Sequence, residues 1–306
     1  MFDIHTDLAM ELKELNPEIE GVVEKDEQDG EIAVKRIGIL TDKAAEKIGK
    51  AIGSYVTLSA DALEQRPLDL FDAVTKKLAA ELRAMLNTDS ESKSILVVGL
   101  GNHKVTPDSL GPRTAEKIYV TRHIKQYMPE AFDFPVPSVC SVAPGVLGVT
   151  GVETSDIVRG VVERVQPDAV IAIDSLSSRR AARISSTIQL CDAGISPGSG
   201  VGNTRAEMSK SSLGVPVIAI GVPLVVHAST IMQDSISLMA NETGMHGDEE
   251  KLKDLAKTVA EKHLDNMIVT PKDIDTIVQD MSMIISNAIN SALFGEKADA
   301  VRSMLT

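Results

Sequence analysis

Three short apolar runs, rich in β-branched residues, constrain the fold of this 306-residue chain more than any other feature. The runs are Ser94–Leu100 (SILVVGL), Ala169–Asp174 (AVIAID) and Val215–Ile220 (VPVIAI). None of them alternates apolar with polar residues, as a strand with one solvated face does, so each predicts a strand that is buried on both faces. Strands of this kind occur mainly in parallel sheets that helices cover on both sides.

Two shorter runs, Ser138–Val142 and Thr187–Leu190, predict further strands, and helical patterns lie between the strands. Leu110–Tyr127 is one predicted helix. Thr154–Val165 is another, and Pro167 stops it two residues later. Strands that alternate with helices predict an α/β fold, a doubly wound, mostly parallel sheet with helices on both faces.

The segments on either side of this core differ from it. Before the core, residues 42–52 and 68–86 have helical patterns, and the charged run Glu24–Glu31 predicts a solvated turn. After it, residues 226–294 are predicted to be wholly helical, with a polar break at 241–250. The sequence therefore predicts an α/β core followed by a helical C-terminal region.

Charge and composition exclude several classes of protein. The chain has 31 Lys and Arg residues against 44 Asp and Glu, a formal charge of −13, so it does not hold nucleic acid through a general phosphate-neutralising surface. It has neither an apolar run of the ~18–20 residues that cross a bilayer nor a secretory signal. Its two cysteines, Cys140 and Cys191, support neither a disulfide framework nor a cysteine-based zinc site. We expect a soluble, intracellular protein without direct contact to nucleic acid or membrane.

Two aspartates follow the predicted central strands. Asp174 closes the run AVIAID, and Asp108 lies in the loop after SILVVGL, just before a predicted helix. The carboxyl ends of parallel strands meet at one edge of a sheet, so we expect both carboxyl groups at that edge. Two interacting carboxyl groups can act as acid and base on one water that attacks an amide carbonyl. Each aspartate also has a structural alternative, a role as helix cap.

Glycine-containing loops at the same edge are candidates for substrate binding or loop support. Gly101 and Asn102 follow the first strand, where glycine lets the backbone turn sharply. A dinucleotide fingerprint would need a third glycine where Lys104 stands. Ser199 and Gly200 lie in the run PGSGVGN, whose spacing differs from that of a nucleophile elbow. This second loop either presents backbone N–H groups to substrate or is a plain connection.

Long segments of the chain resemble the germination proteases of spore-forming bacteria. The likeness extends from HTDLAMELKE (5–14) to VTPKDID (269–275), and it is carried by GLGNHKVTPDSLGP (99–112), APGVLGVTGVETSDI (143–157), AIDSLSSR (172–179), DAGISPGSGVGNTR (192–205) and VIAIGVPLVV (217–226). The resemblance implies a homotetrameric endopeptidase, made as an inactive precursor in the forespore, that degrades small acid-soluble spore proteins in the spore core during germination. It also implies a fold similar to that of the hydrogenase maturation proteases.

The resemblance assigns catalysis to Asp108 and Asp174, without a cofactor. At His227, where the family is expected to have an acidic residue, this chain departs from the pattern. In the related maturation proteases two acids and a histidine bind a divalent metal, so a metal-assisted protease that uses these three residues is the alternative. A lone histidine after a strand is more often a hydrogen-bonded scaffold residue. A spore binding protein that has lost activity is the non-enzymatic alternative.

The resemblance also implies self-cleavage between Asp7 and Leu8. Family substrates are cut after an acidic residue that follows Thr and precedes a hydrophobic and a small residue, with a second acid beyond, and residues 6–12 (TDLAMEL) have this order. The alternative is that Thr6 or Asp7 caps a helix that begins near Leu8. We therefore expect residues 1–7 to be a propeptide.

The remaining residues, 8–306, are expected to form a single α/β peptidase domain. It would consist of an N-terminal flank (8–93), the core (94–226) and the helical C-terminal region (227–306).

Overall fold

The computed structural model describes residues 6–86, 93–198, 206–243, 252, 258–259, 263–264 and 267–305. The strands are β1 (Val22–Asp29), β2 (Ile32–Ile39), β3 (Gly53–Ser59), β4 (Ser94–Gly99), β5 (Ser138–Val142), β6 (Ala169–Ser177), β7 (Thr187–Cys191), β8 (Val217–His227) and β9 (Ile268–Val269). The α-helices are α1 (Ala9–Leu15), α2 (Asp42–Ile48), α3 (Leu68–Leu86), α4 (Leu110–Ala115), α5 (Arg122–Tyr127), α6 (Leu147–Thr150), α7 (Thr154–Val165), α8 (Lys210–Leu213), α9 (Ala228–Thr243), α11 (Ile274–Phe294) and α12 (Ala298–Leu305). Short 3-10 helices include η3 (Thr106–Asp108) and η5 (Ala181–Arg183).

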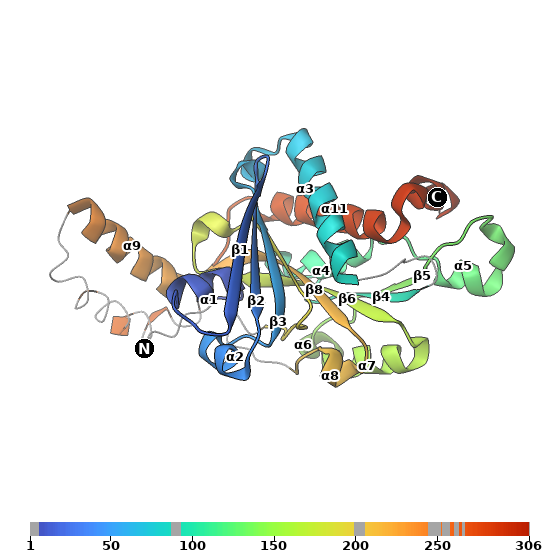
Figure 1. The fold of residues 1–306 in the computed structure, drawn as a ribbon, viewed down its shortest axis with the longest axis horizontal. Helices are drawn as coiled ribbons and strands as arrows, with labels where there is room; N and C mark the ends of the chain where they lie inside the picture. Colours follow the sequence, from blue (N-terminus) through green and yellow to red (C-terminus); the bar gives the residue numbers. More distant parts are fainter. Residues whose placement is uncertain are drawn as a thin grey trace.

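The strands form one mixed sheet in the order β1-β2-β3-β7-β8-β6-β4-β5, with β9 beside β8 (Figure 1). Strands β5, β4, β6 and β8 are parallel neighbours. This half contains the three buried runs predicted from the sequence, although β6 continues past Asp174 to Ser177 and β8 continues past Ile220 to His227. The α/β class is confirmed, and the parallel arrangement holds for this half of the sheet.

The other half of the sheet is antiparallel. Strands β1 and β2 are joined by the two-residue turn Gly30-Glu31, and a connection this short permits only antiparallel pairing. Strand β3 continues the antiparallel order, and β7 pairs antiparallel with both β3 and β8. The expectation of a mostly parallel sheet assigned no strand to the first 93 residues, which supply β1, β2 and β3.

The charged run Glu24–Glu31 is mostly strand and not the predicted turn, because its residues up to Asp29 belong to β1 and only Gly30-Glu31 form a turn. The backbone of β1 pairs residue for residue with β2, and its side chains are largely exposed because β1 is the edge of the sheet. Lys35 of β2 pairs with Glu24, and Lys77 of α3 lies 2.8 Å from Glu27. Charged side chains are common on edge strands, because they oppose pairing with a second sheet. The run is solvated as expected, but in an extended conformation.

Helices cover both faces of the sheet (Figure 1). The adjacent β6 residues Val170 and Ile171 point to opposite faces, and at most 1% of either is exposed. Ile171 belongs to the core that α3, α4 and α11 complete, as shown by Leu78 and Ile285. Val170 belongs to a second core with α7 and α8, and a third core lies under α1 and α2. Among the described helices, none combines the length and apolar composition that crossing a lipid bilayer requires.

The predicted helix Leu110–Tyr127 is two helices, α4 and α5, because tertiary contacts replace helical hydrogen bonds between them. Tyr119 N–H donates to Asn290 Oδ1 of α11 at 3.0 Å, and Asn290 Nδ2 donates to the Lys117 carbonyl at 3.1 Å. Thr121 N–H donates to the carbonyl of Val139 in β5. The predicted helix at 154–165, by contrast, is α7.

The region after residue 226 is not wholly helical. Strand β8 extends to His227, and Ile268–Val269 returns as β9 to pair with its last residues. The helices α9, α11 and α12 account for most of the other described residues there. The predicted polar break at 241–250 lies largely outside the described residues.

Candidate active site

The loop after β4 places Asp108 at the end of η3, directly before α4. Gly101 has a φ of +110°, and a Cβ there would lie 2.1 Å from the carbonyl oxygen of Asp108, so only glycine fits this turn. The turn lets Asn102 N–H donate a hydrogen bond of 2.8 Å to Asp108 Oδ2. Asp108 is therefore not the cap of α4, because Ser109 occupies the N-cap position.

Asp174 lies within β6, opposite Gly221 of β8. Only 5% of the residue is exposed. Its Oδ1 accepts a hydrogen bond of 2.8 Å from the backbone N–H of Ser175, and the strand continues to Ser177. No helix begins at this point, so the alternative role of Asp174 as a helix cap is wrong.

Asp108 and Asp174 line the same cavity, which has a volume of about 320 Å³. Burial raises the pKa of Asp108, although the hydrogen bond from Asn102 N–H opposes the rise. Burial also raises the pKa of Asp174, to well above the ordinary value, and the negative charges of Asp108 and Asp7 add to the effect while Ser175 N–H opposes it. Such a pair can keep Asp174 protonated as an acid while Asp108 is ionised as a base.

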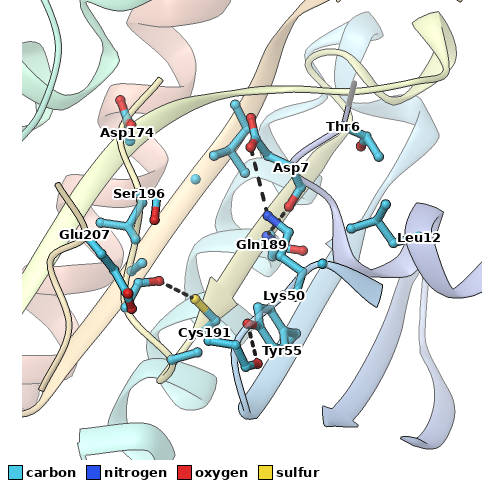
Figure 2. A pocket seen from close by; sticks show the side chains of 18 of the residues that line it. Thr6, Asp7, Leu12, Lys50, Tyr55, Asp174, Gln189, Cys191, Ser196 and Glu207 are labelled. Atoms are coloured by element: carbon cyan, nitrogen blue, oxygen red, sulfur yellow. Dashed lines mark hydrogen bonds and ion pairs between the residues drawn. The ribbon is translucent and has the colours of Figure 1, made fainter. Parts of the chain in front are cut away.

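The cavity beside the pair contains polar groups suited to binding a peptide. Ser175 and Ser177 line it, and their buried hydroxyl oxygens have no hydrogen-bond partner within the described part of the chain. A second cavity, of about 470 Å³, adjoins the first, and both are lined by Asp7, Asp174 and Gly198. Figure 2 shows the second cavity, with Asp7 and Asp174 among the residues that line it. The second cavity is also lined by Lys50, Tyr55, Gln189, Cys191 and Glu207.

The N-terminal segment is docked at this site. Asp7 N–H donates to the carbonyl of Ser177 at 2.9 Å, and Ser177 N–H donates to Asp7 Oδ2 at 2.9 Å. Gln189 spans the Asp7–Leu8 bond, because its Nε2 donates to the Asp7 carbonyl at 3.1 Å and its Oε1 accepts from Ala9 N–H at 2.8 Å. Leu8 is the N-cap of α1 and is fully buried. Asp7 is thus not a helix cap, and the bond expected to be cut is buried beside Asp174.

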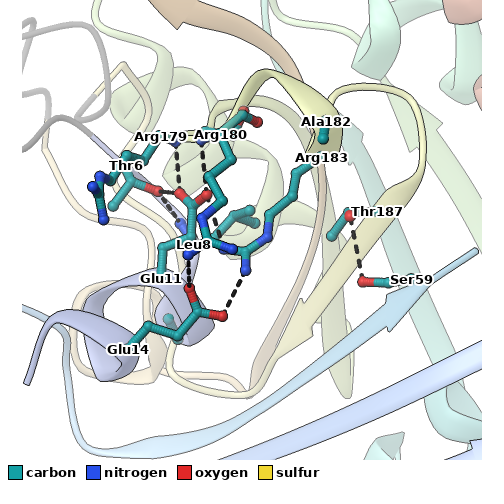
Figure 3. A network of polar contacts seen from close by, with 12 residues as sticks. Thr6, Leu8, Glu11, Glu14, Ser59, Arg179, Arg180, Ala182, Arg183 and Thr187 are labelled. Atoms are coloured by element: carbon teal, nitrogen blue, oxygen red, sulfur yellow. Dashed lines mark hydrogen bonds and ion pairs between the residues drawn. The ribbon is translucent and has the colours of Figure 1, made fainter. Parts of the chain in front are cut away.

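Glu11 ties α1 to the loop after β6 (Figure 3). Only 1% of this residue is exposed, and its carboxylate accepts hydrogen bonds from the backbone N–H groups of Arg179 and Arg180 at 2.6 and 3.0 Å. Arg183 Nη1 forms an ion pair with it at 2.9 Å, and Thr6 Oγ1 donates a further hydrogen bond. Since Thr6 Oγ1 also accepts from Leu8 N–H, the residues on both sides of the Asp7–Leu8 bond are fixed.

His227 is not brought to the aspartate pair. Asp174 is opposite Gly221, and His227 lies six residues farther along β8, where it pairs with Ile268 of β9. Across the described ranges, no three His, Cys, Asp or Glu side chains lie close enough together to hold a metal ion. The alternative metal site, which would consist of Asp108, Asp174 and His227, is therefore not assembled in this structure.

The predicted loop residues have different outcomes. Gly101 and Asn102 support Asp108, and Gly101 also lines the cavity beside it. Ser199 and Gly200 lie outside the described residues, although the preceding Gly198 lines both cavities. Contact of any of these residues with substrate stays a prediction.

Several residues of the site were not singled out in the sequence. Gln189 had a usable indication, because it is a large polar residue between the apolar Ile188 and Leu190 of β7, and it is buried. Ser177 acts through its backbone, which leaves no trace in the residue type. Lys50 comes from a turn far from both aspartates in sequence, and nothing in its neighbourhood distinguishes it from other lysines.

The chain is similar to known proteins over nearly its whole length. A family model described as germination protease matches residues 3–257, a range that contains Asp7, Asp108 and Asp174. The germination protease of Caldanaerobacter subterraneus subsp. tengcongensis is 45% identical over 305 residues, which cover 95% of this chain and 94% of that protein. The germination protease of Clostridium tetani is 42% identical over 308 residues, with 95% of each chain covered. That of Bacillus velezensis is 38% identical over 345 residues, which cover 95% of this chain and 94% of that protein.

Proposed function

The chain belongs to the germination protease family, and from this premise we propose that it is an endopeptidase that starts the degradation of small acid-soluble spore proteins during germination. Family membership identifies it as a peptidase associated with spore germination. The observation that supports the catalytic part of the proposal is the placement of Asp108, from the loop after β4, and Asp174, from within β6, in one cavity, both with a raised pKa.

The two carboxyl groups divide the proton transfers of peptide hydrolysis between them. Asp108, ionised, takes a proton from a water that attacks the peptide carbonyl carbon, while Asp174 gives its proton to the carbonyl oxygen. Asp174 then takes a proton back from the resulting diol, the C–N bond breaks, and Asp108 passes its proton to the leaving nitrogen. The products are a carboxylic acid and an amine, and the pair returns to its starting state.

Removing either carboxyl group should abolish most of the activity. Asp108→Asn and Asp174→Asn each leave a single carboxyl group, which cannot make all the proton transfers that the two groups share. We therefore expect the cleavage rate to fall by about 10²–10⁴-fold or more. The measurement is cleavage of a purified small acid-soluble spore protein, followed by mass spectrometry. Asp156→Asn, on the exposed surface of α7, is the matched control and should keep full activity. Full activity in a folded Asp174→Asn protein would remove Asp174 from the mechanism.

The same premise supports a precursor that cuts itself between Asp7 and Leu8, with residues 1–7 as propeptide and residues 8–306 as one peptidase domain. Asp7 is bound to Ser177 and lines both cavities with Asp174, so the bond lies beside the proposed catalytic pair. A homotetramer in the forespore and spore core, and a fold shared with hydrogenase maturation proteases, belong to the same proposal.

Two other functions are the alternatives. A metal-assisted protease of the maturation type would need His227 beside the aspartates, and β8 carries His227 away from them. An inactive spore binding protein would have no use for two carboxyl groups with raised pKa values in one cavity. Cleavage of a spore protein with and without EDTA separates both from the proposal, since the binding protein cuts nothing and the metal-assisted enzyme stops in EDTA.

A further inference from the structure

The turn after α2 directs a lysine toward the docked N-terminus. Gly49 has a φ of +74°, and Gly49 N–H and Lys50 N–H both donate to the Ala45 carbonyl, at 2.8 and 3.2 Å, so the chain reverses at the end of the helix. Lys50 then lines the larger cavity (Figure 2). Within the described residues its ion pair is with Asp7, at 3.9 Å between Nζ and Oδ1.

Besides Lys50, the backbone N–H of Ser177 at the end of β6 contacts the Asp7 side chain. The register between β6 and β8 shifts by one residue between Leu176 and Ser177, an irregularity of the kind that redirects groups near active sites. Beyond the shift, Ser177 exchanges two hydrogen bonds of 2.9 Å with Asp7, one of them from Ser177 N–H to Oδ2. One carboxylate oxygen therefore faces a backbone N–H and the other faces an ammonium group.

This arrangement distinguishes a carboxylate from an amide. Both groups are donors, and a carboxylate offers acceptors on both of its oxygens, whereas the amide of Asn must turn its NH₂ toward one of the donors. Because Asp7 is buried, the attraction between unlike charges is less screened than at the surface. The pair of donors is therefore selective for an acidic side chain.

We propose that Lys50 and the backbone N–H of Ser177 form the subsite that binds the acidic side chain immediately before the bond that is cut. The inference rests on the proposed function, because it treats Asp7–Leu8 as a substrate bond held in place. While Asp7 fills the subsite no other substrate can use it, and the release of residues 1–7 leaves it vacant for the acidic residue of another peptide.

A purely structural role for the Lys50–Asp7 pair would not explain why Gln189 and Asp174 lie around Asp7. Gln189 holds the Asp7 carbonyl, which belongs to the bond expected to be cut, at 3.1 Å. Asp7 also lies close enough to Asp174 to contribute to its raised pKa, and both residues line the two adjoining cavities. An anchor for the N-terminus alone does not require its carbonyl and side chain to be held next to the catalytic pair.

Two peptides test the proposal. One has the sequence HTDLAMELKE of residues 5–14, and the other carries Asp7→Asn within it. Each is incubated with the wild-type protein and with its Lys50→Gln and Lys50→Arg variants, all in the processed form that begins at Leu8 so that Asp7 does not occupy the subsite, and kcat/KM is measured by mass spectrometry. Lys47→Gln, an exposed lysine of α2, removes the same charge three residues away and is the control.

We expect the wild type and Lys47→Gln to prefer the Asp peptide by at least about tenfold, the usual effect of one charge-assisted contact. Lys50→Gln should lose most of this preference by cutting the Asp peptide more slowly, with the Asn peptide unchanged, and Lys50→Arg should keep it. A folded Lys50→Gln protein with the full preference, or a wild type without one, overturns the subsite while the proposed function stands. If the wild type cuts neither peptide nor a spore protein, the proposed function fails, and the subsite fails with it.

Discussion

At the scale of single residues, ionising Asp174 is unfavourable in the folded chain. The side chain is buried, and the negative charges of Asp108 and Asp7 lie near it, so its pKa in the folded protein is well above the ordinary value of 3.8. The folded chain therefore holds a proton that the unfolded chain has already released. The stability contributed by this group is greatest below pH 3.8 and declines as the pH rises through the folded-state pKa.

Asp174→Asn should consequently stabilise the fold at neutral pH while it abolishes activity. Asn cannot ionise, so the variant avoids a penalty of about 1.4 kcal/mol for each unit by which the folded pKa exceeds the unfolded one. Thermal melting of variant and wild type between pH 3.5 and neutral pH measures the difference, which should shrink toward the acidic end. A wild type that is the more stable of the two at neutral pH would contradict the prediction.

Asp174 was predictable because an acid that closes a buried apolar run is unusual, and Asp108 because it lies in the loop that follows another such run. The sequence alone left open whether they were helix caps, since a cap is defined by the donors around the carboxylate, and these come from Asn102 and Ser175. Lys50 was not predictable, because its position depends on how α2 packs beside β6 and β7.

At the scale of elements, the extended conformation of β8 places His227 far from Asp174. Asp174 is opposite Gly221, and the six residues from there to His227 span about 20 Å of extended strand. We therefore expect that EDTA dialysis, and independently His227→Ala, leave turnover of a spore protein within a few-fold of the untreated wild type. His123→Ala, an exposed histidine on α5, is the control. If both treatments silence the enzyme and Zn²⁺ restores the dialysed protein, a metal takes part and the prediction is wrong.

The link between α1 and the loop around η5 depends on one buried charge. Glu11→Gln would leave Arg183 without its buried ionic partner, and breaking a buried pair typically costs about 3–5 kcal/mol. Arg183 also pairs with Glu14, whose side chain is partly exposed, so Glu14→Gln should cost at most about 1 kcal/mol. Urea denaturation of the two variants compares these losses in free energy of unfolding. Equal losses would show that Glu11 is not the residue on which the link depends.

All strands of the parallel half of the sheet were predicted, β4 and β5 nearly to the residue, although β6 and β8 continue three and seven residues beyond their predicted ends. In the antiparallel half β7 was predicted, and β1, β2 and β3 were missed. The central strands are buried on both faces and therefore consist of continuous apolar runs, as in β4 and β6. Strand β1 has one neighbour and little burial, so its sequence, VVEKDEQD, contains no hydrophobic pattern to detect. Pairing with β2 determines its conformation, and pairing is a property of the folded chain.

At the scale of the whole molecule, the N-terminal residues 6–11 are docked at the site that contains Asp174. Residues 6–11 are held by β6, β7 and the loop after β6 through backbone and side-chain hydrogen bonds. Loss of residues 1–7 removes Asp3 and Asp7, which changes the formal charge from −13 to −11, too little to act through the overall field. If cleavage activates the chain, we therefore expect the activation to come from vacating the space beside Asp174.

Because Asp7 is docked against the β6 and β7 of its own chain, we expect each molecule to cut itself. N-terminal sequencing of wild-type protein under activating conditions should give Leu8, with a half-time that does not depend on protein concentration. Asp108→Asn should still begin at Met1, even when mixed with active wild type, since a bond buried in one molecule is not accessible to the site of another. Trimming of the mixed variant at the wild-type rate would show cleavage between molecules. Trimming of the pure variant would show that another protease makes the cut.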